Sequence, residues 1–233
     1  MTAHDYKKFA KEYASLEIKD SFYLAYRDIP DLIKKYVKGN KALDYGCGGG
    51  RSTRFLKKLD FSTIGVDISK EMISEAKKKD INGDYYLIKS GKLPFKNSSF
   101  DLAFISIVFI EISSKEEMIC ILKEIRRVLK RGGVAIIITG TPEGYTSNWS
   151  SFICDFPENR KLNSGDKAKL IIRGTSVVLY DYVWFDDDYK ETFEKADLKL
   201  ISKHYPMPNR DNSFKWYSES KKPLWVIYAL KRD

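Results

Sequence analysis

The stretch Leu43-Asp44-Tyr45-Gly46-Cys47-Gly48-Gly49-Gly50 decides the fold of this 233-residue chain. The short segment 41–45 predicts a strand, and the glycines after it predict a tight turn that opens a helix over 51–59. Glycine is needed in such a turn because it takes positive φ and lets the backbone pass close to a ligand. The stretch therefore predicts the first strand–turn–helix unit of an open α/β sheet, with a ligand site at the turn.

Strands and helices alternate around this turn. Strands are expected at 61–66, 84–88, 100–108 and 134–138, and helices at 29–37, 70–79 and 115–129. Ser69 is the expected N-cap of the helix over 70–79, and Lys130-Arg131-Gly132-Gly133 is the expected stop of the helix over 115–129. The all-apolar segment 134–138 is typical of a parallel strand buried on both faces. This order predicts a doubly wound, Rossmann-like, mostly parallel sheet.

The regular alternation stops after residue 140. Residues 142–186 are aromatic and loop-rich, and we expect them to form a substrate-side insertion after the fifth strand, a lid with a β-hairpin of 169–173 and 177–184. A helix at 187–196 and an antiparallel pair of strands at 198–204 and 224–230 complete the chain. We expect one domain over 1–233, with residues 1–38 as an N-terminal helical lid.

Composition narrows the protein class. Hydrophobic residues make up 43% of the chain, enough for a sizeable core. The longest apolar run, 102–112, is shorter than the ~20 residues of a membrane helix, and the N-terminus around His4 has no apolar signal core. We expect a cytoplasmic monomer or homodimer without membrane contact. The net charge of +9 could attract nucleic acid, but the lysines are scattered, which favours a solvated basic surface.

The three cysteines, Cys47, Cys120 and Cys154, are too few and too widely spaced for a disulfide framework or a paired-cysteine zinc site. We expect all three to be reduced and buried, and we expect no metal site.

Two acidic residues beside the turn indicate what it binds. Asp67 ends the second predicted strand and is placed to accept hydrogen bonds from both hydroxyls of a ribose. Asp44 can hold the amino group of a cationic amino-acid tail, directly or through water. The fingerprint of nicotinamide dinucleotide proteins has glycine or alanine where Arg51 stands, and it lacks an acid two residues before the first glycine. The turn therefore favours an adenosyl amino acid over a dinucleotide.

The pattern Asp44-x-Gly46-x-Gly48-x-Gly50 resembles the first motif of the class I S-adenosylmethionine-dependent methyltransferases. Leu93-Pro94-Phe95-x-x-x-Ser99-Phe100-Asp101 and Glu124-Ile125-x-Arg127-Val128-Leu129-Lys130-x-Gly132-Gly133 resemble two later segments of the same family. The resemblance covers about residues 5 to 140 and the final two strands. It implies a seven-stranded sheet with the last strand antiparallel, and a methyltransferase (EC 2.1.1.-) that converts S-adenosylmethionine to S-adenosylhomocysteine.

The resemblance also implies which residues bind the cofactor. In the family a tyrosine of the N-terminal lid commonly meets the cofactor carboxylate, and Tyr13 is the choice here. Lys89 stands where relatives often have an acid that accepts the adenine amino group, which leaves Ser90 or the backbone for this contact. The backbone of Ser106 is expected beneath the sulfonium. The full set of expected cofactor contacts is Tyr13, Arg27, Asp44, Gly46, Cys47, Gly48, Asp67, Ile68, Met72, Ser90, Gly91 and Ser106.

The acceptor is expected against the aromatic insertion. Walls formed by Tyr145, Trp149, Phe152, Tyr182 and Trp184 would suit a flat aromatic or heterocyclic acceptor, or an amine held by cation–π contact. His204 is the first choice as general base because imidazole titrates near neutral pH, and Glu111 and Asp155 follow. These features favour methyl transfer to an oxygen or nitrogen atom of a small molecule.

Three alternatives stay open. An RNA methyltransferase would fit the positive charge, although the chain shows no RNA-binding appendage and no Asn/Asp-Pro-Pro-Tyr/Phe sequence. A nicotinamide oxidoreductase would bind a nicotinamide cofactor in place of S-adenosylhomocysteine. A noncatalytic protein of the same fold would bind S-adenosylhomocysteine and transfer nothing.

Overall fold

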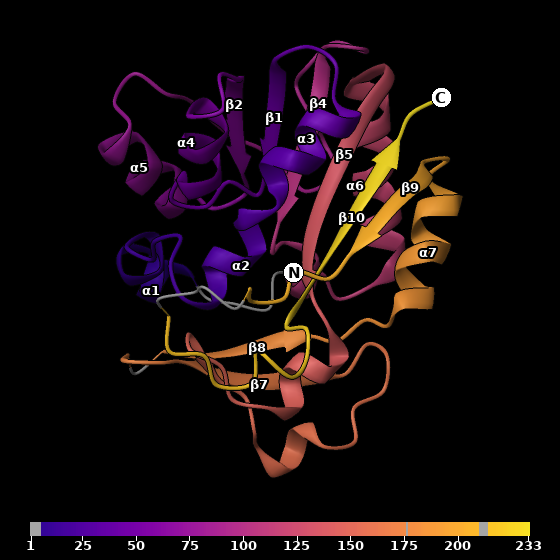
Figure 1. Ribbon diagram of the computed structural model, residues 1–233. Coiled ribbons are helices and arrows are strands. Elements are labelled where there is room, and N and C mark those ends of the chain that lie inside the picture. The colour runs from indigo at the N-terminus through magenta and orange to yellow at the C-terminus, as the bar shows by residue number, and fades with distance from the viewer. Residues whose placement is uncertain (1–5, 176, 210–213) are drawn as a thin grey trace.

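The computed structural model describes residues 6–175, 177–209 and 214–233. A seven-stranded sheet in the order β3-β2-β1-β4-β5-β10-β9 runs through the molecule (Figure 1). Its strands are β1 Lys41–Tyr45, β2 Ser62–Asp67, β3 Asp84–Leu87, β4 Phe100–Ser106, β5 Leu129–Gly140, β9 Lys199–His204 and β10 Trp225–Lys231. The strands β1 to β5 are parallel to one another, and β10 is antiparallel to both β5 and β9. The predicted fold class is confirmed.

Helices cover both faces of the sheet. They are α1 Tyr6–Ala14, α2 Ser21–Arg27, α3 Ile29–Tyr36, α4 Arg51–Lys57, α5 Lys70–Lys79, α6 Lys115–Val128 and α7 Asp186–Lys195. Leu102 and Phe104 of β4 pack in one core with α2 and α3, whereas Ala103 and Ile105 pack in the other with α6 and α7. Burial on both faces explains why the middle of β4, residues 102–105, is apolar. None of the described helices has the length and apolar composition to cross a bilayer.

The helix α5 begins as the sequence predicts. The hydroxyl of Ser69 accepts a hydrogen bond from the backbone N–H of Met72 at 3.2 Å, which satisfies one of the free donors of the first turn. The cysteine prediction is only partly right. Cys47 and Cys154 are buried, but Cys120 is exposed, because it lies on the solvent side of the amphipathic helix α6.

The predicted glycine stop after α6 is wrong. The helix ends at Val128 and β5 begins at the next residue, so Gly132 and Gly133 lie inside the strand. Gly132 has a φ of +75°. Its N–H donates to the carbonyl of Arg232 at 2.7 Å, and the N–H of Arg232 donates to the carbonyl of Gly133 at 2.9 Å. Pairing with the C-terminal segment thus extends β5 through glycines that resemble a helix stop.

The insertion forms a small antiparallel sheet in the order β6-β7-β8. Its strands are β6 Phe152–Ile153, β7 Lys167–Ile172 and β8 Val178–Tyr182, and short 3-10 helices span Phe109–Glu111, Pro142–Thr146 and Pro157–Asn159. The predicted hairpin is therefore present, with a third short strand beside it. In Figure 1 this sheet lies beyond the carboxyl ends of the parallel strands, on the same side as α1 and α2.

A buried carboxylate joins the N-terminal helices to the insertion. Glu219 accepts hydrogen bonds from the backbone N–H of Ser150 at 2.7 Å and from the Ser21 hydroxyl at 2.8 Å. Ser21 at the start of α2 also accepts from the N–H of Ser151 at 3.0 Å, and its carbonyl accepts from Trp225 Nε1 at 2.7 Å. These bonds fix α2 and the insertion together over the end of the main sheet.

Candidate cofactor and acceptor site

The Gly-rich turn connects β1 to α4 at the carboxyl end of the sheet. Gly46, Gly48 and Gly50 have φ angles of +71°, +50° and +78°, which L side chains rarely adopt. The N–H groups of Gly46 and Cys47 donate to the carbonyl of Val66 at 2.8 and 3.0 Å, so the turn is fastened to β2. A Cβ added at Gly48 would meet no atom within 4 Å, which shows that this glycine faces open space.

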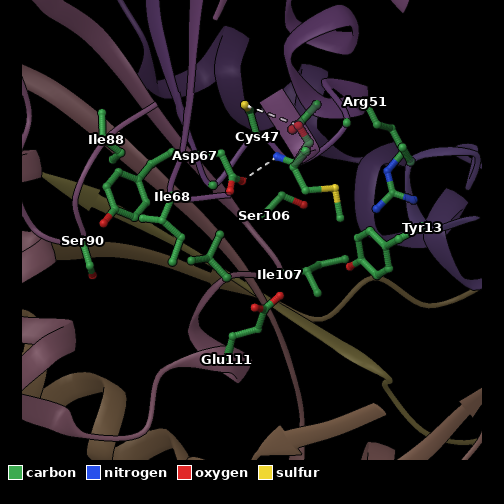
Figure 2. Close-up of a pocket in the computed structure, with 18 of the residues that line it drawn as sticks. Tyr13, Cys47, Arg51, Asp67, Ile68, Ile88, Ser90, Ser106, Ile107 and Glu111 are labelled. Atoms are coloured by element: carbon green, nitrogen blue, oxygen red, sulfur yellow. Dashed lines mark hydrogen bonds between the residues drawn. The ribbon is translucent and has the colours of Figure 1, made fainter. Parts of the chain in front are cut away.

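That open space is a cavity of about 860 Å³, measured out to its mouth (Figure 2). Nine of the twelve predicted cofactor residues line it, namely Tyr13, Gly46, Cys47, Gly48, Asp67, Ile68, Met72, Ser90 and Ser106. The lining residues that the sequence did not single out for the cofactor include Tyr26, Arg51, Ile88, Ile107 and Glu111. The turn, the end of β2 and the N-terminal helices thus enclose one space.

Asp67 lines this cavity from the carboxyl end of β2 (Figure 2). Its Oδ2 accepts from the N–H of Gly48 at 2.8 Å, and its Oδ1 accepts from the N–H of Ser69 at 2.8 Å. Burial raises the pKa of Asp67 to about 6, although these two backbone bonds oppose the rise. Each carboxylate oxygen has a second lone pair, so both can also accept from ligand hydroxyls.

Asp44 is buried behind the turn and does not line the cavity directly. Its Oδ2 accepts from the hydroxyls of Ser52 and Thr53 at 2.7 and 2.6 Å. Its Oδ1 has no hydrogen-bond partner among the described residues. Burial raises the pKa of Asp44 to about 6, and the bonds from Thr53 and Ser52 oppose this rise.

Arg51 supplies a positive charge to the lining of this cavity. Its guanidinium lies over the Phe22 ring at 4.2 Å and near the Tyr26 ring at 5.9 Å. Its Nη1 is buried and has no hydrogen-bond partner among the described residues. Aromatic faces hold the guanidinium and leave this N–H donor available to an anionic ligand group. The sequence signal that could have identified Arg51 is its position directly after the last glycine of the turn.

The end of the cavity away from Arg51 is mainly apolar. Figure 2 shows Ile68, Ile88 and Ser90 grouped there, and Met72 also lines the cavity. The Ser90 hydroxyl donates to a carboxylate oxygen of Glu117 at 2.8 Å. Since its hydrogen is engaged, Ser90 can act toward a ligand only as a hydrogen-bond acceptor.

Two residues predicted for the site lie elsewhere, on a cluster around Asp28. Arg27 pairs with Asp28 at 2.6 Å and donates to the carbonyl of Met207 at 2.8 Å. His204 Nε2 is 2.6 Å from Asp28 Oδ2. Neither residue lines the cavity. His204 lies far from it because it ends the edge strand β9, three positions from β4 in the sheet order.

The other predicted residues divide between the cavity and its surroundings. Glu111 lines the cavity, and its carboxylate points into it in Figure 2. Asp155 lies on the surface of the insertion, where its Oδ1 is 3.7 Å from Nη2 of Arg160. Gly91 stands beside the cavity and donates its N–H to the Tyr45 hydroxyl at 3.1 Å. His4, with residues 1–5 of the expected lid, is outside the described residues.

A second, partly open cavity of about 490 Å³, measured out to its mouth, adjoins the first, and Tyr13 and Ile107 line both. Its further lining residues are Phe22, Ile110, Gly140, Thr141, Gly144, Tyr145, Phe152, Cys154, Leu170, Leu179, Asp181, Leu224 and Trp225. Of the predicted acceptor residues, Tyr145 and Phe152 are therefore in place.

The other predicted acceptor residues do not line this second cavity. Trp149 is fully buried and donates its Nε1 to the carbonyl of Gly144 at 2.6 Å. Trp184 donates its Nε1 to the carbonyl of Ile112 at 3.0 Å, and Tyr182 lies under the Lys167 ammonium at 5.1 Å. These three side chains pack between elements instead of lining the second cavity. The prediction was wrong because aromatic composition does not reveal which side chains of an insertion face inward.

Comparison with known proteins places the chain among methyltransferases. A family model described as a methyltransferase domain matches residues 43–137. An uncharacterised protein of Methanocaldococcus jannaschii is 36% identical over 132 residues, covering 57% of this chain and 59% of that one. A demethylmenaquinone methyltransferase of Bacillus velezensis is 31% identical over 159 residues, covering 64% of this chain and 67% of that one.

Solved structures share the fold. An S-adenosylmethionine-dependent methyltransferase of Clostridium acetobutylicum superimposes with a TM-score of 0.65 at 18% identity, covering 97% of this chain and 98% of that one. Among the curated relatives, the match spans 59%, 48% and 50% of three proteins, so the chain spans about half of their length.

Gly48→Ala should weaken S-adenosylhomocysteine binding by at least about tenfold, because the new methyl group would enter the cavity. Gly132→Ala is the matched control. Gly132 also has a positive φ and no atom within 4 Å of an added Cβ, but it lies in β5 away from the cavity. Both variants should lose about 1 kcal/mol of folding free energy. Isothermal titration and thermal melts would measure these effects, and equal affinity in the two variants would contradict this placement of the cofactor.

The affinity for S-adenosylhomocysteine should fall as the pH drops below about 6, where Asp44 and Asp67 become protonated. Ligand groups that donate hydrogen bonds favour the ionised carboxylates. Each carboxylate that takes up a proton therefore lowers the affinity by up to about tenfold per pH unit. Asp44→Asn should reduce this slope. The free energy of unfolding of the ligand-free protein changes with pH in the opposite direction. Because burial raises the pKa of these two carboxyls in the folded state, their protonation stabilises the folded protein as the pH falls from about 6 toward the pKa that they have in the unfolded chain.

Titrations between about pH 5 and pH 8 would measure the slope for both proteins. A pH-independent affinity would show that neither carboxylate meets the ligand.

Proposed function

Because the chain belongs to the class I S-adenosylmethionine-dependent methyltransferases, we propose that it methylates an oxygen or nitrogen atom of a small-molecule acceptor. The observation that carries the proposal is the pair of adjoining cavities that share Tyr13 and Ile107. One has the charged and polar groups that the cofactor requires, and the other is mainly apolar. A donor and an acceptor could therefore meet at the shared residues.

The unpartnered buried atoms support the fit of the cofactor. Asp44 Oδ1 and Arg51 Nη1 flank the Gly-rich turn, and each lacks a hydrogen-bond partner among the described residues. The amino-acid tail of the cofactor carries an ammonium and a carboxylate group, which complement these two charges. Asp44 would act through the turn, directly or by way of water, whereas Arg51 lines the cavity itself.

The remaining lining residues suit the nucleoside. Asp67 would accept from the ribose hydroxyls with the lone pairs that Gly48 and Ser69 leave available. The adenine ring would lie against Ile68, Met72 and Ile88, and Ser90 could accept from its amino group. Ser90 would thereby replace the acidic residue that is missing at Lys89.

The bound cofactor supplies an already activated methyl group, so the chain's own residues need only orient the acceptor, exclude water and receive a proton. Tyr13 and Ile107 stand where the two cavities meet and would align the acceptor. Glu111 is the predicted base that lines the cofactor cavity, and it is only 9% exposed. We therefore assign proton acceptance to Glu111 rather than to His204 or Asp155.

The second cavity supports a small acceptor. Its walls are buried apolar side chains from β7, β8 and the C-terminal segment, and apolar pockets of this kind suit small molecules. The demethylmenaquinone named for the Bacillus relative is also a small molecule. An RNA substrate remains the alternative that the net charge of +9 would suit, and a direct assay separates the two.

Arg51→Met should weaken the binding of S-adenosylhomocysteine by at least about tenfold, because the carboxylate of the ligand loses its positive partner. Binding of 5′-methylthioadenosine should stay unchanged, since this analogue has the nucleoside but lacks the amino-acid tail. Isothermal titration of both ligands would test the assignment. An equal loss for the two ligands would indicate that Arg51 supports the fold instead of the tail.

Purified protein should transfer labelled methyl groups from S-adenosylmethionine to a metabolite extract and not to total RNA. Glu111→Gln should lower the turnover by at least about tenfold if the acceptor must lose a proton, with little change in cofactor affinity. Scintillation counting of the separated fractions would measure both effects. Label that appears only in RNA would overturn the small-molecule assignment, and label in neither fraction would favour a noncatalytic binding protein.

A further inference from the structure

The main sheet has two edge strands, β9 and β3, and only β9 has features that block further pairing. The register between β9 and β10 shifts by one residue between Ala229 and Leu230, and β9 carries Lys199 and Lys203. Bulges and lysines commonly keep an edge strand from pairing with another chain. β3 pairs with β2 in unbroken register and contains no lysine. Among the described residues no strand lies beyond β3, so its outer edge is open to a further strand.

Large apolar side chains surround this open edge. Leu87 is 54% exposed and Tyr86 is 46% exposed, and Ile81 in the turn before β3 is 88% exposed. Neighbouring residues of a strand point to opposite faces of the sheet, so Tyr86 and Leu87 place apolar surface on both faces beside the edge. A single exposed apolar residue is ordinary, but three of them around an unpaired edge are typical of a protein interface.

The two ends of β3 carry opposite charges. Asp84 begins the strand, and Lys89 and Lys92 lie in the turn after it, where the N–H of Lys92 donates to the carbonyl of Lys89 at 3.0 Å. All three side chains are exposed, and none forms an ion pair with another described residue. Opposite charges that face each other across two strands stabilise the pair, and like charges destabilise it. This edge therefore complements a second copy of itself that runs in the opposite direction.

We propose that the chain forms a homodimer in which the β3 strands of two copies pair antiparallel around a two-fold axis. Such an axis makes the same patch of both copies the interface and joins the two main sheets into one. Asp84 of each copy then lies beside the Lys89–Lys92 turn of the other, and Tyr86 and Leu87 of both copies meet at the centre of the pair. This inference goes beyond methyl transfer and does not depend on the identity of the acceptor.

Sedimentation velocity of the full chain between about 5 and about 500 µM should show a monomer–dimer equilibrium with a Kd in the micromolar range. The association should be weak because β3 has only four residues, and stable interfaces bury at least about 1,200 Å² in total. A chain that stays monomeric throughout this range would overturn the proposal and leave the edge to a different protein.

Leu87→Lys should raise the Kd of the dimer at least about tenfold, because it places an ammonium group at the centre of the strand pair. The matched control is Val178→Lys, which changes an exposed apolar residue of β8, the edge strand of the insertion. The Kd of this control should equal that of the unmodified chain. A dimer that Leu87→Lys does not weaken more than Val178→Lys would show that the copies meet elsewhere and would overturn the proposal.

An exchange of charges tests the antiparallel direction. Asp84→Lys alone, and the double variant Lys89→Glu with Lys92→Glu alone, should each self-associate at least about tenfold more weakly than the unmodified chain, because like charges meet at both ends of the pair. An equimolar mixture of the two should form a heterodimer about as tight as the unmodified dimer, since opposite charges then meet at both ends.

Sedimentation with a fluorescent label on one variant would measure the heterodimer, and thermal melts would show that both variants are folded. A mixture of folded variants that associates no better than either variant alone would overturn the antiparallel pairing. The comparison of Leu87→Lys with Val178→Lys still decides which surface pairs if a charge variant does not fold.

Discussion

The hydrogen bond from the N–H of Gly48 to the carboxylate of Asp67 is the contact on which the site depends. It joins the turn after β1 to the end of β2 and leaves the open side of Gly48 facing the cavity. The next glycine is equally constrained, because a Cβ at Gly49 would stand 2.5 Å from the Cβ of Ala14. The turn thus positions the ligand space on one side and receives the end of α1 on the other.

Asp44 and Asp67 make the ligand-free site electrostatically costly. Burial raises the pKa of both carboxyls to about 6. The charge of Asp67 adds to the rise at Asp44, and the charge of Glu111 adds to the rise at Asp67. Hydrogen bonds from Ser52, Thr53, Ser69 and the turn hold the two carboxylates in place before any ligand arrives. Such fixed acceptors lose little freedom on binding, so a ligand that supplies matching donors gains most of their interaction energy.

How far the sequence predicts the molecule depends on the range of the interactions involved. The strands, the N-cap at Ser69 and the Gly-rich turn follow from neighbouring residues and were predicted closely. The placement of His204 was not, because it depends on β9 being the edge strand of the sheet. Arg51 was adjacent to the motif, but its role depends on rings from α2 that are distant in sequence. Asp181 gave no local signal, since the register of β8 alone turns it inward.

The net charge of the surface and the charges buried in the cavities act on a ligand over different distances. Scattered lysines and arginines give the chain +9 and a general attraction for anions at long range, which salt screens. Glu111 and Asp181 are buried, where opposite charges interact more strongly and over short distances. A ligand that enters either cavity must leave water and come close to these buried groups, whatever attracted it to the surface. The groups that line the two cavities, rather than the net charge, therefore decide which ligands fit there.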